Sequence, residues 1–168
     1  MKADSRAGAS MLVHATRFDP QAYPWLSWRW AVERFVDGED LSQKHGSDAS
    51  GRVYVYFDTI GMPWQKRNVD YVWSAVLPVG ALVVSPFAHT SKMIVAESGR
   101  DHADQWRLEA HNLVEDYHRC FGPKTMPAVV AIGLMTDTDS AHGQGLAYFT
   151  DVRVSQQQPV EPNAPASP

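Results

Sequence analysis

The chain has 168 residues, of which 44% are hydrophobic and 20% charged, and this suits one globular domain built around one core. A formal net charge of −4 argues against the basic surface of a nucleic-acid-binding protein and against a polybasic membrane anchor. The single cysteine, Cys120, excludes an internal disulfide and a cysteine-based zinc cluster.

The two ends of the chain differ from its middle. Residues 1–10 (MKADSRAGAS) lack the apolar run of a signal peptide, so they predict a flexible N-terminus and, for the chain as written, a cytoplasmic protein. The longest apolar stretch, 75–84, is shorter than the roughly 20 residues of a membrane helix. Residues 155–168 are rich in Pro and Gln and predict a disordered tail.

The middle of the chain predicts short strands separated by turn signals. In 51–58 (GRVYVYFD), Val53, Val55 and Phe57 share one face, and polar or aromatic residues share the other. In 25–36 (WLSWRWAVERFV), the residues Trp28 and Trp30 fall on the expected core side. Further strands are expected at 11–16, 70–77, 81–85, 92–97, 129–135 and 146–154.

One segment departs from the strand pattern. Between Asp104 and Phe121, apolar residues recur at helical spacing. Asp101 or Asp104 can cap the start, and Gly122 ends the pattern. We therefore expect a mostly β fold: a single antiparallel β-sandwich domain over 11–154, with one amphipathic helix near 104–121.

The first candidate site is a polar and aromatic sheet face. If the strands align, Arg52, Tyr54 and Tyr56 share this face with Trp73 of the next strand. Flat rings offer apolar contact area and arginines offer planar paired donors, which suits a glycan. The alternative is that the rings belong to the core and the arginines pair with acidic residues. The predicted ligand-binding residues are Arg29, Arg52, Tyr54, Tyr56, Trp73 and Lys92.

The second candidate is the loop that contains Asp137 and Asp139. Two carboxylates two residues apart, with Ser140 beside them, could hold Ca²⁺ through oxygen ligands, although the loop lacks the full EF-hand pattern. The alternative is an ordinary turn stabilised by aspartate side chains. A structural Ca²⁺ is the one cofactor that the sequence suggests.

Two weaker candidates concern metals and catalysis. His111, Glu115 and His118 would share one face of the expected helix, either as a metal site or, as we favour, as a solvated face. The sequence has no nucleophile elbow, phosphate-binding loop or zinc-protease motif. The alternative of a glycosidase with two catalytic carboxylates stays open, and any two of Glu97, Glu109, Asp137 and Asp139 could supply them.

Several blocks together resemble a known family. They are LSWRWAV (26–32), DLSQKHGSDASGRVYVYFD (40–58), YVWS (71–74), KMIVAESG (92–99), NLVEDYHRCFG (112–122) and MTDTDS…AYFTDVRV (135–154). In this order they resemble the uncharacterised family "domain of unknown function 3047". Where many members have paired aspartates this chain has Asp48-Ala49, which argues against a two-carboxylate site in 44–52.

The resemblance carries further expectations. Members commonly have an export signal and more N-terminal strand sequence, which implies a periplasmic protein if such a segment precedes this chain. Without it a sheet edge would be uncovered, and self-association would cover it. The last hairpin is also similar to that of galactose-binding-like jelly rolls, which implies a jelly-roll-like sandwich and Asp151 as a further Ca²⁺ ligand.

These observations predict a non-catalytic binding module for a glycan or another polyhydroxylated ligand. They predict no nucleic-acid or membrane partner, and they allow a homo-oligomer. The alternatives are a carbohydrate-active hydrolase or lyase that uses a carboxylate, and a structural or assembly domain.

Overall fold

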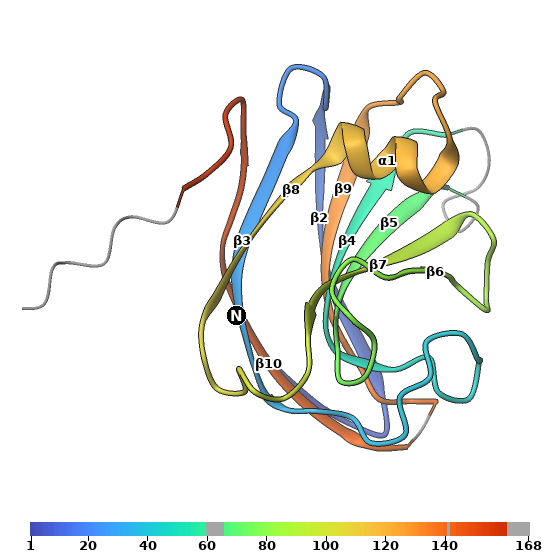
Figure 1. Ribbon diagram of the computed structural model, residues 1–168, viewed down its shortest axis with the longest axis vertical. Coiled ribbons are helices and arrows are strands. Elements are labelled where there is room, and N and C mark those ends of the chain that lie inside the picture. The colour runs from blue at the N-terminus through green and yellow to red at the C-terminus, as the bar shows by residue number, and fades with distance from the viewer. Residues whose placement is uncertain (60–65, 141, 161–168) are drawn as a thin grey trace, which may run out of the picture.

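The computed structural model describes residues 1–59, 66–140 and 142–160, which form two β-sheets packed face to face with one short helix at one end (Figure 1). The four-stranded sheet has the order β1-β10-β3-β8 and the six-stranded sheet the order β2-β9-β4-β5-β7-β6. Strand pairs are antiparallel except β5 with β7. The elements are β1 (Lys2–Arg6), β2 (Ala9–Phe18), β3 (Trp25–Arg34), β4 (Ala49–Phe57), β5 (Asn68–Ser74), β6 (Leu82–Val84), β7 (Ser91–Ser98), β8 (Arg107–Asn112), α1 (Leu113–Phe121), β9 (Val129–Asp137) and β10 (Gln144–Ser155).

The expected β-sandwich with one helix is confirmed, and the core lies between the two sheets. Trp28 and Trp30 of β3 are fully buried against Tyr71 and Trp73 of β5. Ring centroids are 5.3 Å apart for Trp28 and Tyr71, and 5.6 Å apart for Trp30 and Trp73. Since side chains alternate along a strand, the odd-numbered residues of β3, which include Arg29 between these tryptophans, point to the opposite, outer face of the four-stranded sheet.

A second, smaller apolar cluster covers the other face of the six-stranded sheet. Leu41, in the loop between β3 and β4 (residues 35–48), packs there with Val72, Met93 and Val95. The central strands of this sheet are therefore buried on both faces, as their nearly continuous burial indicates.

Two segments differ from the expectation. Residues 2–6, expected within a flexible N-terminus, form β1 and pair with Gln144 to Tyr148 of β10. The helix begins at Leu113 rather than near 104, because Arg107–Asn112 forms β8 on the edge of β3. Trp106 therefore lies outside the helix. No helix in the described ranges has the length and apolar character to cross a membrane.

Two of the open strand edges in the described part of the chain are long, those of β2 and of the second half of β10. β2 is the last strand of its sheet, with Leu12 59% and Val13 51% exposed. β1 pairs with the first half of β10 alone, so the second half of β10 pairs on one side, with β3. That half carries a bulge at Asp151, whose φ is 53°.

Candidate functional site

The outer face of the four-stranded sheet carries a polar and aromatic groove. A hollow of about 290 Å³ is lined by Ala31 and Glu33 of β3, Tyr148 of β10, and Asp104 and Trp106 before β8. A second hollow, of about 420 Å³, lies farther along the same face of β3, where Ser27 and Arg29 contribute to it. From residue 27 to residue 33 the strand rises by roughly 20 Å, so the two hollows together form an elongated surface.

Trp106 and Tyr148 are the aromatic walls of this groove. The Trp106 side chain is 49% exposed, and its ring centroid lies 6.4 Å from that of Tyr148, with a 56° angle between the planes. The Tyr148 hydroxyl donates a 2.8 Å hydrogen bond to Glu33 Oε2, and this contact raises the pKa of Tyr148. The backbone N–H of Asp104 donates to the Val32 carbonyl at 3.0 Å and so holds the entry to β8 against β3.

Arg29 lies in the second hollow, as part of a surface that also includes Asp151 and Arg153 of the β10 bulge. Arg153 Nη2 lies 3.1 Å from Asp151 Oδ1. The predicted residues Arg29 and Asp151 are therefore on the same sheet face, although the sequence suggested unrelated roles for them. The short segment after β10 adds Gln157, Pro159 and Val160 to the wall.

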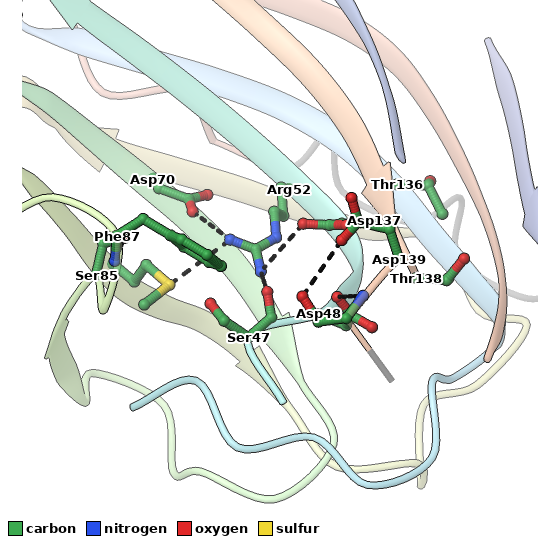
Figure 2. Close-up of polar contacts among 12 residues, drawn as sticks. Ser47, Asp48, Arg52, Asp70, Ser85, Phe87, Thr136, Asp137, Thr138 and Asp139 are labelled. Atoms are coloured by element: carbon green, nitrogen blue, oxygen red, sulfur yellow. Dashed lines mark hydrogen bonds and ion pairs between the residues drawn. The ribbon is translucent and has the colours of Figure 1, made fainter. Parts of the chain in front are cut away.

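A second polar site lies on the outer face of the six-stranded sheet and is centred on Arg52 (Figure 2). The Arg52 guanidinium is buried and donates to Asp70 Oδ2 at 2.8 Å and to the Ser47 carbonyl at 2.5 Å. Burial raises the pKa of Asp70 to about 6, against the opposing effect of Arg52. The contact with Ser47 fixes the end of the 35–48 loop to the sheet.

Three aspartates lie together next to Arg52. One carboxylate oxygen from each of Asp48, Asp137 and Asp139 lies within 4.8 Å of the others. Asp48 and Asp137 are buried, and Asp137 Oδ2 is 3.8 Å from Arg52 Nη2. Burial, with the neighbouring Asp48 and Asp139 carboxylates, raises the pKa of Asp137 to about 7 although Arg52 opposes this.

The predicted ligand-binding residues do not form one surface. Tyr54 and Tyr56 stack at 5.7 Å on the outer face of β4, beside Arg52, and are half-buried. Trp73 lies in the core, and its Nε1 donates to the Gly99 carbonyl at 3.0 Å. The expected common face is therefore wrong for Trp73, because the register pairs Tyr54 with Asp70 and Gly51 with Trp73. Ligand binding by Tyr54 and Tyr56 stays a prediction.

Lys92 also lies apart from Tyr54. It pairs with Val69, a core residue, and so belongs to the inner side of β7. Burial raises the pKa of the nearby Cys120 in α1, and the positive charge of Lys92 opposes this rise. Alternation along one strand shows which of its residues share a face. It does not show which face of the neighbouring strand lies on the same side, because that depends on how the two strands pair.

The predicted metal ligands are divided as well. Asp137 and Asp139 come together, and Asp48 joins them from the 35–48 loop, which no pattern in the sequence places beside them. Asp151 does not join them: it lies in the β10 bulge beside Arg153, and the three-residue acidic cluster of the described chain does not include it. The spacing of acidic residues along the chain could not reveal Asp48, because its proximity to Asp137 arises from the pairing of β4 with β9.

The expected face of His111, Glu115 and His118 is not present on one helix, since His111 belongs to β8. Its imidazole lies 3.3 Å from Asp116 and 3.7 Å from Glu109, and it stacks on Trp28 at 5.4 Å. Among the acids considered for catalysis, Glu97 pairs with Arg107 at 2.8 Å, and Glu109 accepts from Trp30 Nε1 at 3.1 Å.

Comparison with known proteins gives a family without an activity. No curated protein matches the chain. The family model described as "Protein of unknown function (DUF3047)" matches residues 1–153, which is nearly the whole described chain. The chain therefore belongs to the DUF3047 family of proteins of unknown function.

Proposed function

We propose that the protein is a non-catalytic binding module that takes a saccharide in the groove between Trp106 and Tyr148. The observation that carries the proposal is the half-exposed indole of Trp106, which stands beside Tyr148 over a floor formed by the small residue Ala31. Rings at the surface of a groove offer flat apolar area to the C–H faces of a sugar, while polar neighbours meet its hydroxyls.

The exposed part of Trp106 is large enough to matter energetically. A tryptophan buries roughly 200 Å² when fully covered, so covering the exposed half removes roughly 100 Å² from water. At about 25 cal/mol per Å² this contributes roughly 2.5 kcal/mol to binding, before the cost of ordering the ligand.

The polar groups define the ligand class. Glu33 and Asp104 are carboxylates that accept hydrogen bonds from hydroxyls or from an amino group. The Trp106 end therefore suits a neutral or amino sugar. Arg29, in the adjoining hollow, suits a carboxylate or a pair of hydroxyls on a neighbouring unit. The proposed ligand is an oligosaccharide that lies along β3.

The test is binding of a panel of oligosaccharides by calorimetry, with Trp106→Ala as the diagnostic variant. We expect at least a tenfold loss of affinity, which is about 1.4 kcal/mol. The matched control is Phe87→Ala, because Phe87 is a 62% exposed aromatic residue between β6 and β7, away from the groove. Equal affinities for the two variants, or no binding by any member of the panel, would contradict the proposal.

The same panel addresses catalysis. New reducing ends that appear with the wild-type chain and vanish in Glu33→Gln would show that the groove hydrolyses its ligand. That result would replace the non-catalytic proposal with the hydrolase alternative.

A further inference from the structure

Three carboxylates from distant parts of the sequence meet at the end of the sandwich away from α1. Asp48 ends the 35–48 loop, while Asp137 and Asp139 lie where β9 turns toward β10 (Figures 1 and 2). Oxygens of the three lie within 4.8 Å of one another. Ca²⁺ binds oxygen at 2.3–2.6 Å, so two oxygens on one ion are at most about 5 Å apart. The three side chains are therefore close enough to approach one Ca²⁺ ion together.

The state of Asp137 gives an independent indication of a ligand. The residue is 9% exposed, and its Oδ1 has no hydrogen-bond partner in residues 1–59, 66–140 and 142–160. Its other oxygen, Oδ2, contacts Arg52 at 3.8 Å. A buried carboxylate oxygen without a donor is costly, and native structures satisfy such atoms with a hydrogen bond, a water or an ion.

The charge at this end is not balanced by Arg52. The guanidinium contacts Asp137 but donates its shorter hydrogen bonds to Asp70 and to the Ser47 carbonyl. One positive charge is thus shared by Asp70 and Asp137, while Asp139 adds a further carboxylate beside them. A divalent cation would offset this excess, and carboxylate oxygens are the ligands that hard cations prefer.

The surrounding backbone holds the cluster in place. The Ser140 N–H donates to Asp48 Oδ1 at 3.1 Å and so links the β9–β10 turn to the 35–48 loop. The Thr138 N–H donates to the Gly8 carbonyl at 3.0 Å, and the Thr136 hydroxyl donates to the Ser50 carbonyl at 2.9 Å. These contacts hold the Asp48 side chain and the backbone on both sides of Asp137 next to one another.

We propose that Asp48, Asp137 and Asp139 bind a calcium ion that fastens the 35–48 loop to the β9–β10 turn. Mg²⁺ fits less well, because it requires near-ideal octahedral geometry and gives up its waters reluctantly, whereas Ca²⁺ accepts irregular sets of oxygen ligands. This site is separate from the saccharide groove, and neither proposal depends on the other.

The experiment is titration of the EDTA-treated and dialysed full chain with CaCl₂, followed by calorimetry and thermal unfolding. We expect saturable binding and a rise in melting temperature, since an ion that binds the folded chain alone stabilises it. Asp139→Asn should weaken binding at least tenfold. Asp139 is exposed, so this variant should fold, and circular dichroism measures whether its secondary structure matches that of the wild type. The matched control is Asp151→Asn, an exposed aspartate outside the cluster, which should bind as the wild type does.

Three results would overturn the proposal. One is a wild-type chain that shows neither heat nor a shifted melting temperature with CaCl₂. Another is an Asp139→Asn variant that binds with wild-type affinity, which would place the ion elsewhere. The third is an equal stabilisation by MgCl₂ at the same concentration, which would reject calcium as the preferred ion.

Discussion

His111 couples protonation to the packing of the core. Its ring stacks on Trp28 and lies between the carboxylates of Glu109 and Asp116. Burial alone would lower the pKa of His111, but the nearby carboxylates of Asp116 and Glu109 outweigh it and raise the pKa above the ordinary 6.5. The folded chain therefore holds the imidazolium more firmly than the unfolded chain does.

This predicts a pH-dependent contribution to stability. A folded pKa above the unfolded one gives stabilisation that is fully present below about pH 6.5 and is lost as the pH rises through the folded pKa. Urea unfolding of the wild type and of His111→Gln should show a stability difference that shrinks from pH 5 to pH 8.5. A difference that is constant over this range would show that the residue acts through packing alone.

At the scale of elements, the junction of β8 and α1 depends on Asn112. Its Oδ1 accepts hydrogen bonds from the backbone of Val114 at 3.0 Å and of Glu115 at 3.3 Å, and its Nδ2 donates to the Glu115 carboxylate at 3.1 Å. One residue thus ends a strand and caps a helix. A single helix over 104–121 does not form, because residues 107–112 pair with β3 as a strand and the helix begins only after its cap, Asn112.

The cap leads to a prediction about matched variants. Asn112→Ala removes the side-chain acceptor and should lower the free energy of unfolding by about 1 kcal/mol. Asn112→Asp keeps an acceptor at the same position and should stay near the wild type, since Asn and Asp cap helices about equally well. Urea unfolding measures both. Equal losses in the two variants would mean that the Asn112 contacts do not stabilise the helix.

At the scale of the whole molecule, the open edge of β2 predicts self-association. An unpaired strand with exposed Leu12 and Val13 is a template for pairing with another chain. Sedimentation should show a dimer that grows with concentration, and Val13→Lys should reduce it. Leu82→Lys is the control, because Leu82 is 41% exposed on β6, the short opposite edge of the same sheet. A monomer at all concentrations, or an equal effect of both variants, would contradict this prediction.

The sequence predicted what is local and missed what depends on pairing. Alternation in 51–58 correctly separated Val53 and Val55 from Arg52 and Tyr54, because the period of two belongs to the strand itself. Nothing in that pattern says which face of β5 meets which face of β4, so Trp73 was expected on the wrong side. Trp106 was missed because a short apolar recurrence fits both a helix and a strand edge.

The distribution of the tryptophans makes the protein its own optical probe. Of the six tryptophans, Trp28, Trp30 and Trp73 lie in one buried cluster, where Trp28 and Trp30 meet edge to face at 5.4 Å and 88°. Trp106 stands in the groove and is open to solvent quenchers. Near-ultraviolet circular dichroism therefore follows the buried rings, while the part of the iodide quenching that Trp106→Phe removes reports on the groove, apart from any contribution of Trp25 and Trp64. Loosening of the core and occupation of the groove can be distinguished in one sample without any added label.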